Sequence, residues 1–368
     1  MAKTPLYRLA DLGQSVWIDY LSRDLLQSGK LERMMEEDAV VGVTSNPTIF
    51  QKALSSGDAY DEQLREVLEE ESDPKEIFLR LAERDVTDAL DLLRRVWDEG
   101  GGRDGYVSIE VDPHLAYETE ATVAEARRLH AEIDRPNLFV KIPATKPGLP
   151  AIEDMIAKGK SINVTLIFSL ERYREVAEAY IRGLERLVAA GGNPTAVASV
   201  ASFFVSRVDT EADRRLDELG GPAELKGKLA IANAKLAYQR YKELFSGERW
   251  EFLASKGASP QRCLWASTST KNPDYPDVMY VENLIGPMTV DTMPEETIEA
   301  FKDHGKVAPT LEQGVDEAKR TFERFAEAGI DYDDVVETLE REGVEKFAES
   351  FRELIEGLKA KAGELVAA

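Results

Sequence analysis

Short apolar runs alternate with long amphipathic ones along most of this 368-residue chain, and this alternation restricts the fold more than any other feature. Repeated strand and helix units predict a parallel sheet whose strands are separated by helices. The predicted strands cover residues 15–20, 39–44, 106–111, 138–142, 162–168, 195–203, 262–267 and 278–284. The clearest helical patterns between them cover residues 73–99, 116–133, 149–158 and 170–190. Eight such units close into a (β/α)8 TIM barrel, so an α/β barrel is the predicted fold.

The chain is longer than such a barrel requires, since the barrel core takes about 250 residues. Residues 209–257 exceed one crossover and contain a long helical stretch at 222–245. Residues 315–361 add charged helices, which we expect to wrap around the outside of the barrel. No linker rich in Pro and Ser interrupts the sequence. We therefore expect residues 1–368 to form a single TIM-barrel domain, with extra helices inserted after the sixth strand, at 209–257, and at the C-terminus, at 315–368.

An open, doubly wound sheet is the alternative architecture for alternating strands and helices. It usually carries a glycine-rich phosphate-binding loop after an early strand. No G-x-x-x-x-G-K-[ST] motif occurs here, and the glycine run that begins at Gly100 precedes a strand, as is typical of a flexible turn. The barrel is therefore the preferred prediction.

The composition limits the classes of partner. Hydrophobic residues make up 43% of the chain and charged residues 31%, which is enough for a large core. The formal net charge of −23 argues against nucleic acid and membrane surfaces as partners, because both are anionic. A few cations in a cleft can still hold one small anion.

Cysteine, histidine and long apolar segments are scarce. The single cysteine, Cys263, excludes an internal disulfide, and with only three histidines we expect no metal site. No apolar stretch approaches the roughly 18 residues of a membrane-spanning helix. The first five residues, MAKTP, lack the apolar core of a signal peptide. We therefore expect a cytoplasmic protein.

Lys141 stands out because it lies inside NLFVKIPAT, residues 137–145, a run that is otherwise typical of a buried strand of a parallel sheet. Lysine is rarely buried. Burial disfavours a charged ammonium group and favours a neutral amine, which can attack a carbonyl. A Schiff-base lysine is one interpretation. The other is an edge lysine that extends to water or pairs with a carboxylate.

Polar residues recur at the carboxyl ends of the predicted strands, where TIM barrels carry their active sites. They are Asp19, Thr44, Asn46, Glu110, Asp112, Lys141, Asn163, Thr165, Ser202, Arg207, Ser267 and Ser269. Taken singly, Asp19 could cap a helix, Asn46 could belong to a turn, and Glu110 could pair with Lys141. Together they form a polar ring around a buried amine, which a purely structural core would not need.

Five of these strands carry segments that resemble, in order, the signature segments of the transaldolase family. The segments are GVTSNPTIF at 42–50, VSIEVD at 107–112, VKIPAT at 140–145, INVTLIF at 162–168 and ASFFVSR at 201–207. The similarity extends from Asp19 to Leu284. Five motifs on consecutive strands are far more specific than one short motif.

The resemblance implies an enzyme without a cofactor that acts in the non-oxidative pentose phosphate pathway. Such an enzyme moves a dihydroxyacetone unit from a ketose phosphate, such as sedoheptulose 7-phosphate or fructose 6-phosphate, to an aldose phosphate, such as glyceraldehyde 3-phosphate or erythrose 4-phosphate. By the same resemblance, Lys141 would form the Schiff base, Asp19 would accept the proton in carbon–carbon cleavage, and Glu110 with Thr165 would manage the water lost on imine formation. The implied substrate-binding residues are Thr44, Asn46, Asn163, Ser202, Phe204 and, for the phosphate, Arg207.

The chemistry of the residues agrees with these roles. Cleaving a carbon–carbon bond next to a hydroxyl needs an electron sink, which an iminium on Lys141 supplies. It also needs a base, and burial can raise the basicity of a carboxylate such as Asp19. A transferase must also keep its intermediate away from water, a task suited to amide side chains such as Asn46 and Asn163.

The segment after the seventh strand departs from the family pattern. Many transaldolases place a second arginine there for the phosphate, whereas this chain has Ser267, Ser269 and Lys271. The two serines can donate hydrogen bonds, and Lys271 can supply a positive charge. The lysine ammonium group is a compact charge, whereas the arginine guanidinium is planar and can form two parallel hydrogen bonds. Lys146, in the loop after Lys141, is a further basic candidate, although a solvated loop lysine is the commoner case.

Three alternative functions stay open at this point. A simple class I aldolase would use the same lysine but release dihydroxyacetone. A non-catalytic barrel would bind sugar phosphates as a sensor or scaffold, although binding alone does not call for Lys141, Asp19 and Glu110 together. An interaction protein would use the acidic tail at 331–364, which is more simply an amphipathic helix pair covering the barrel. The sequence is compatible with a monomer and with a homodimer.

Overall fold

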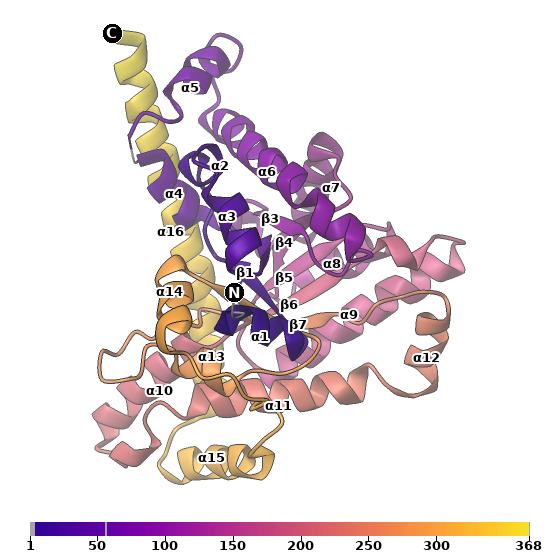
Figure 1. Cartoon of the computed structure of the whole chain (residues 1–368), viewed down its shortest axis with the longest axis vertical. Coiled ribbons are helices and arrows are strands. Elements are labelled where there is room, and N and C mark those ends of the chain that lie inside the picture. Colours follow the sequence, from indigo (N-terminus) through magenta and orange to yellow (C-terminus); the bar gives the residue numbers. More distant parts are fainter. Residues whose placement is uncertain (1–3, 56, 368) are drawn as a thin grey trace.

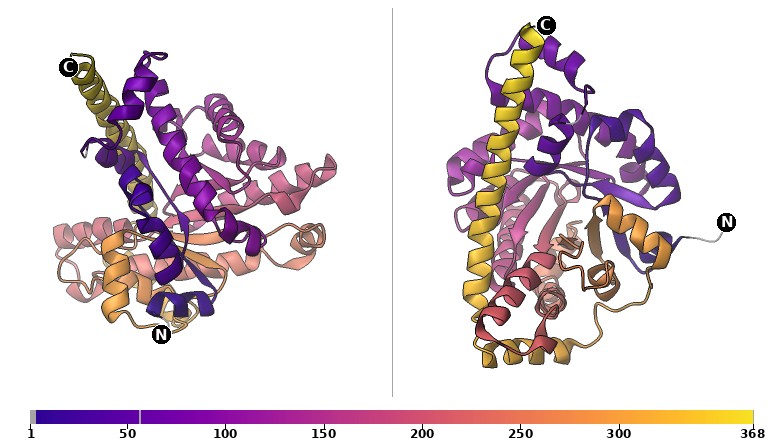
Figure 2. Two further views of the ribbon diagram at one scale, coloured as in Figure 1. Left: turned by 45° about the horizontal axis from the view of Figure 1, so that its top comes forward. Right: turned by 90° about the vertical axis from the view of Figure 1, so that its left-hand side faces the viewer.

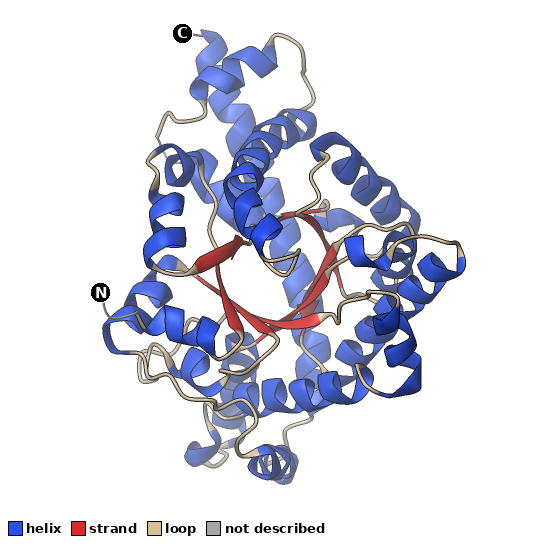
Figure 3. Ribbon diagram, turned by 45° about the vertical axis from the view of Figure 1, so that its right-hand side comes forward, coloured by secondary structure: helices blue, strands red, loops and turns tan. Residues whose placement is uncertain are grey.

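The computed structural model describes residues 4–55 and 57–367 and contains a closed barrel of eight parallel strands (Figure 3). Residues 1–3, which belong to the N-terminal run considered above, lie outside the described residues. Each strand pairs with its neighbours in chain order, and β1 also pairs with β8. The predicted TIM barrel is therefore confirmed. Among the described residues, every helix is too short or too polar to span a membrane.

Most of the strands form because they are short apolar runs whose side chains are buried. They are β1 (Gln14–Ile18), β2 (Val40–Val43), β3 (Tyr106–Glu110), β4 (Leu138–Pro143), β5 (Ile162–Ile167), β6 (Ser199–Phe204), β7 (Arg262–Ala266) and β8 (Thr289–Met293). Apart from single positions in β2 and β3, every strand residue is buried. Strands that are buried on both faces show no alternation of polar and apolar residues, which is why they read as continuous apolar runs.

The helices surround the barrel (Figure 1). They are α1 (Pro5–Asp11), α2 (Arg23–Gln27), α3 (Lys30–Glu37), α4 (Pro47–Ser55), α5 (Asp61–Leu68), α6 (Pro74–Glu99), α7 (Thr119–Ile133), α8 (Gly148–Ala157), α9 (Leu170–Ala189), α10 (Ser206–Leu219), α11 (Leu229–Leu244), α12 (Gly247–Ser255), α13 (Met279–Asn283), α14 (Glu295–His304), α15 (Val315–Glu327) and α16 (Tyr332–Ala367). Short 3-10 turns are η1 (Pro113–Leu115), η2 (Pro194–Ala196) and η3 (Ala223–Leu225).

The start of two long helices is fixed by side-chain caps. Asp73 accepts hydrogen bonds from the backbone N–H groups of Lys75 and Glu76 before α6. Ser169 accepts one from Arg172 before α9. Such caps satisfy donors that the first turn of a helix leaves without partners. The helices predicted at 73–99 and 170–190 are confirmed within a residue or two.

The eighth predicted strand was wrong. Residues 278–284 contain α13, and the eighth strand is β8 further along the chain. Tyr280 and Val281 of this short helix and Leu284, which directly follows it, are buried, so an apolar run of this length fits a buried helical turn as well as a strand. The true strand, TVDTM, contains three polar residues and the buried carboxyl group of Asp291, so it lacks the apolar run expected of a barrel strand. The predicted sixth strand also began too early, since η2 occupies its first residues.

The segment predicted as an insertion between β6 and β7 contains α10, η3, α11 and α12. The stretch expected to be one helix at 222–245 is divided, because Pro222 and the positive φ of Gly227 interrupt it before α11. Within the C-terminal extension, α15 lies beside α11 (Figure 1).

The last helix, α16, does not wrap around the outside of the barrel as expected. It crosses the carboxyl ends of the strands (Figure 2). Thr48 at the start of α4 donates a hydrogen bond of 2.8 Å to Ser350, and Arg172 of α9 forms an ion pair of 3.0 Å with Glu340. Because α4 follows β2 and α9 follows β5, these contacts place α16 across the mouth of the barrel.

Candidate active site

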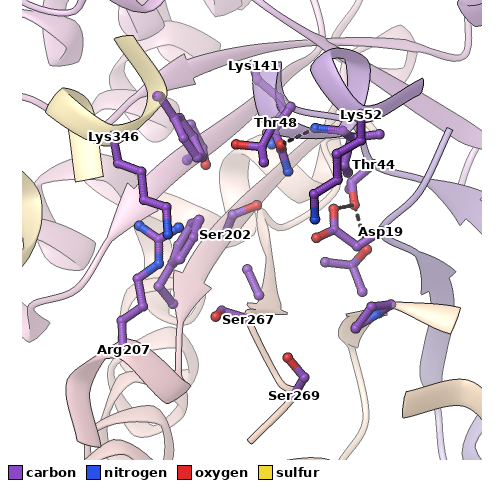
Figure 4. A pocket seen from close by; sticks show the side chains of 18 of the residues that line it. Asp19, Thr44, Thr48, Lys52, Lys141, Ser202, Arg207, Ser267, Ser269 and Lys346 are labelled. Atoms are coloured by element: carbon purple, nitrogen blue, oxygen red, sulfur yellow. Dashed lines mark hydrogen bonds between the residues drawn. The ribbon is translucent and has the colours of Figure 1, made fainter. Parts of the chain in front are cut away.

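A cavity of about 280 Å³ opens at the carboxyl ends of the strands, below α16 (Figure 4). Its volume is just below the usual range for small-ligand sites, which begins at about 300 Å³. All of the predicted site residues except Glu110, Asp112 and Asn163 line it, namely Asp19, Thr44, Asn46, Lys141, Thr165, Ser202, Phe204, Arg207, Ser267, Ser269 and Lys271, whereas Asp112 forms an ion pair with Lys75. Glu110 and Asn163 lie next to it, in the wall of the barrel. Residues that are far apart in the sequence are thus brought together at the mouth.

Lys141 lies in the middle of β4, where the register pairs it with Glu110 of β3 and Asn163 of β5. Its side chain is only 6% exposed. Its Nζ donates a hydrogen bond of 3.0 Å to the backbone oxygen of Ser45 and lies 3.6 Å from Oε2 of Glu110. The second distance is an ion-pair distance but is too long for a hydrogen bond. The amine is therefore held at the floor of the cavity, within reach of a carboxyl group.

Glu110 is the last residue of β3, and its side chain is 5% exposed. Burial, opposed by the charge of Lys141, raises the pKa of Glu110 to about 7. Among the described residues, neither Oε2 of Glu110 nor Oγ1 of Thr165 has a hydrogen-bond partner, although both atoms are buried. Both can therefore bind a small polar group, and Glu110 can exchange a proton near neutral pH.

A bulge in β5 presents Thr165. The register with β6 passes from Val164 to Ile167 with one extra residue on β5, and Leu166 has a φ of 58° there. A bulge of this kind turns side chains away from the regular alternation of a strand. Thr165 consequently lines the cavity, while Leu166 lies below α16.

Asp19 directly follows β1, and its backbone N–H donates to the oxygen of Met293 in β8. Its Oδ1 accepts a hydrogen bond of 2.6 Å from Oγ1 of Thr44, which also lies 2.6 Å from Oγ1 of Thr292. Burial raises the pKa of Asp19, against the opposing effects of Lys141 and of the Thr44 hydrogen bond. Asp19 does not cap the following helix, because Ser22 caps α2. The carboxyl group instead faces the cavity.

The two predicted asparagines lie in different surroundings. Asn46 lines the cavity, and its Oδ1 accepts a hydrogen bond of 3.0 Å from the backbone of Ile49 at the start of α4. Asn163 is fully buried. It donates to Oγ of Ser108 at 3.1 Å and accepts from Oγ of Ser202 at 2.7 Å. Asn163 thus orients Ser202, which lines the cavity.

Arg207 lies in the first turn of α10, and its guanidinium stands 5.0 Å from the ring of Phe204 and 5.8 Å from the ring of Phe347. Burial lowers the pKa of Arg207, opposed by Asp19 and Glu110, but an arginine stays charged in a protein. Within residues 4–55 and 57–367, no carboxylate forms an ion pair with it. The guanidinium can therefore bind an anion in the cavity.

The segment after β7 adds hydroxyl groups to the same end of the cavity. Ser267 has a φ of 57°, and its Oγ lies 2.8 Å from Oγ of Ser206 at the start of α10. Ser269 accepts a hydrogen bond of 2.8 Å from Nζ of Lys271. Lys146, the competing basic residue, is exposed and does not line the cavity.

Sequence reasoning missed several side chains that line the cavity: Thr48 and Lys52 of α4, Thr292 of β8, Glu296 of α14, and Lys346 and Phe347 of α16. Thr48 belongs to one of the segments quoted above, so the sequence contained a signal for it. Thr292 was not predicted as a site residue because the eighth strand was placed at the wrong residues. No local signal distinguishes Lys346 from the other charged residues of a long helix.

No arrangement typical of a metal site is found in the described part of the chain, where no three His, Cys, Asp or Glu side chains are grouped to hold an ion. Cys263 is buried in β7, and its Sγ lies 3.5 Å from the hydroxyl of Tyr173. It packs as a small apolar side chain away from the cavity.

Comparison with known proteins identifies similar sequences over almost the whole chain. The family model described as Transaldolase/Fructose-6-phosphate aldolase matches residues 16–358. A transaldolase of Frankia alni is 53% identical over 362 residues, which is 98% of each chain. A transaldolase of Acidothermus cellulolyticus is 54% identical over 352 residues, 95% of each chain. Transaldolase 2 of Streptomyces coelicolor is 50% identical over 359 residues, 97% of this chain and 96% of the relative.

Proposed function

The chain belongs to the transaldolase/fructose-6-phosphate aldolase family, and on that premise we propose that it transfers a dihydroxyacetone unit from a ketose phosphate to an aldose phosphate. It is an enzyme of the transferase class, and its family forms a Schiff base in the pentose phosphate pathway. The observation that carries the assignment to this site is the buried Nζ of Lys141, 3.6 Å from Glu110, in the cavity that Asp19 also lines.

The first step joins the ketose to the enzyme. The amine of Lys141 attacks the C2 carbonyl, forming a carbon–nitrogen bond, and loss of the former carbonyl oxygen as water leaves an iminium. Glu110 and Thr165 are suited to this loss, because each has a buried oxygen without a hydrogen-bond partner in the described structure. With a pKa near 7, Glu110 can give a proton to the leaving hydroxyl and take one back.

The second step breaks the bond between C3 and C4. Asp19 accepts the proton of the C4 hydroxyl, the C4 oxygen becomes an aldehyde, and the electron pair of the broken bond moves into the iminium to form an enamine. A raised pKa makes the Asp19 carboxylate a stronger base. The aldose phosphate leaves, and an acceptor aldose phosphate then reacts with the enamine by the reverse sequence.

The donor and acceptor phosphates are bound at the end of the cavity that contains Arg207, Ser267 and Ser269. Arginine suits this role because its guanidinium can hold phosphate through two parallel hydrogen bonds. The remaining hydroxyl groups of the sugar meet the polar wall made by Thr44, Asn46 and Ser202. That wall contains several hydrogen-bonding groups suited to a polyol.

Transfer and simple aldol cleavage differ in the fate of the enamine. We expect fructose 6-phosphate with erythrose 4-phosphate to give glyceraldehyde 3-phosphate and sedoheptulose 7-phosphate in equal amounts. Without an acceptor, free dihydroxyacetone should form far more slowly. Quantifying the three products by mass spectrometry tests this. Release of dihydroxyacetone at the same rate with and without acceptor would identify a simple aldolase instead.

The oligomeric state of the protein and its location in the cell stay predictions. Both a monomer and a homodimer are compatible with the sequence, and light scattering separates them. A cytoplasmic location is expected from the sequence, and cell fractionation tests it.

A further inference from the structure

The cavity is rich in cations although the protein as a whole is strongly acidic. Five cationic side chains of the described residues line it, against two carboxylates, Asp19 and Glu296. The whole chain, by contrast, carries a formal net charge of −23. A concentration of positive charge inside an acidic protein marks a place where an anion binds.

One of these cations comes from the C-terminal helix. Lys346 of α16 reaches down toward Arg207, and Figure 4 shows the ends of the two side chains pointing toward one another. The next residue, Phe347, places its ring 5.8 Å from the guanidinium of Arg207. Two successive residues of α16 therefore lie on the side of the cavity that contains the arginine proposed to hold phosphate.

Close packing of α16 fixes this position. Gly343 lies one turn before Lys346, and a Cβ there would come within 3.0 Å of Cδ2 of Leu166 in β5. Ser350, about one turn after Lys346, accepts the hydrogen bond from Thr48. Contacts on both sides of Lys346 thus hold this part of the helix against the barrel mouth, so the ammonium group is presented to the cavity by a rigid element.

Two like charges that face each other repel unless an anion lies between them. Neither Arg207 nor Lys346 has an ion pair with a carboxylate in the described part of the chain. A phosphate between them would turn the repulsion into two charge-assisted contacts. Lys271 lies near the same two charges. Partial burial lowers the pKa of Lys271, and the positive charges of Arg207 and Lys346 lower it further, whereas the carboxylate of Glu296 raises it.

We propose that Lys346 is the second cation for the substrate phosphate, supplied by the C-terminal helix in place of the arginine that this chain lacks after β7. The inference rests on the proposed function, because the anion is the phosphate of that substrate. Lys271 is the competing candidate, because it also lines the cavity, where its Nζ donates one hydrogen bond to Ser269. The serines complete the site by donating to phosphate oxygens. Substrate binding consequently fastens α16 to the barrel.

The test uses Lys346→Gln in the full-length enzyme, with Lys346→Arg as the charge-preserving variant. The matched control is Lys359→Gln, an exposed lysine on the same helix that does not line the cavity. The ratio of kcat/KM for fructose 6-phosphate to kcat/KM for unphosphorylated fructose should fall at least about tenfold in Lys346→Gln, as expected for losing a charge-assisted contact. It should recover in Lys346→Arg and stay at the wild-type value in Lys359→Gln.

A second readout does not depend on turnover. Inorganic phosphate should slow hydrogen exchange of the backbone amides at 340–350 in the wild-type enzyme, because it bridges α16 to Arg207. The slowing should be lost in Lys346→Gln and kept in Lys359→Gln. Melting curves show whether each variant is folded.

The outcomes separate the two proposals. Wild-type enzyme without transfer activity would refute the proposed function. A second outcome is normal transfer by the wild-type enzyme together with an unchanged ratio of the two kcat/KM values in Lys346→Gln, which includes equal losses on both substrates. This outcome would refute the role of Lys346 and leave the proposed function standing. If Lys271→Gln instead produced the specific loss, the second cation would be Lys271.

Discussion

Lys141 is the residue on which the proposed chemistry depends most directly. It is buried in a strand beside Glu110, whereas the neighbouring Lys146 is exposed in a loop. Borohydride reduction in the presence of fructose 6-phosphate should therefore add a three-carbon unit or the intact sugar to the peptide that contains Lys141. Peptide mass mapping measures the adduct.

The controls for this trapping are two substitutions. Lys141→Ala should abolish the adduct, and Lys146→Ala should leave it unchanged. An adduct on any other lysine of the wild-type enzyme would overturn the assignment of Lys141.

Replacing each of the two carboxyl groups should slow a different step of the reaction. Asp19→Asn should still be trapped by borohydride while carbon–carbon cleavage slows by about 10²–10⁴-fold, the usual worth of a positioned base. Glu110→Gln should slow imine formation and remove a titration near pH 7 from that step, since the pKa of Glu110 is raised to about 7. Rapid-quench measurements of trapping and of aldehyde release separate the steps. Equal loss of trapping in both variants would show that these roles are misassigned.

Asp291 of β8 is a buried carboxyl group outside the proposed chemistry. One oxygen accepts a 2.8 Å hydrogen bond from Thr268, and the other has no partner among the described residues. Burial raises the pKa of Asp291 to about 7. Between pH 4 and 7 the folded state therefore binds more protons at this site than the unfolded state, so the contribution of Asp291 to stability falls as pH rises.

We therefore expect Asp291→Asn to gain stability over wild type as pH rises from 4 to 7, by up to about 1.4 kcal/mol per pH unit, with a constant difference above that range. Urea unfolding at several pH values measures it. Asp316→Asn is the control, because that side chain is 86% exposed. A difference between Asp291→Asn and wild type that does not vary with pH would contradict the raised pKa.

At the scale of elements, two glycines of α16 distinguish its packing against the barrel from its intrinsic stability. Gly357 is exposed, and a Cβ there would have no neighbour within 4 Å. Gly357→Ala should stabilise the protein by up to about 1 kcal/mol, because glycine is a poor helix former. Gly343→Leu should destabilise it and raise KM for fructose 6-phosphate, since the added atoms would meet Leu166 and Phe168 and lift the helix from the cavity.

Thermal unfolding and steady-state kinetics of the two variants test this comparison. A stable Gly343→Leu enzyme with unchanged KM would show that α16 does not need its close contact with β5.

The same helix explains why a hydrophobic pattern alone cannot place an amphipathic segment. Its apolar face could cover any side of the barrel, and the pattern does not say which.

For the whole molecule, we propose that residues 1–368 form one domain, as the sequence analysis expected. Apolar side chains along α16, including Val335, Leu339, Phe347, Leu354 and Leu358, are buried in the same core cluster as the barrel. Helices that share one core should unfold with it.

A single calorimetric transition is therefore expected, with the calorimetric enthalpy equal to the van't Hoff enthalpy. A chain truncated before α16 should aggregate, because the barrel mouth would expose apolar surface. Calorimetry of the full chain and light scattering of the truncated chain test this. Two separate transitions would show that the C-terminal extension is an independent unit.

The barrel and most of the polar ring follow from local patterns in the sequence. Strands buried on both faces appear as continuous apolar runs, and their carboxyl ends meet at one face, so the placement of Lys141, Asp19 and Thr165 could be predicted. Local patterns failed at β8, where Thr and Asp side chains interrupt the apolar run. The position of α16 across the barrel mouth, with Lys346 lining the cavity, could not be predicted from those patterns. The physical reason is that local periodicity reports which face of a helix is buried, whereas its partner depends on contacts between residues far apart in the chain.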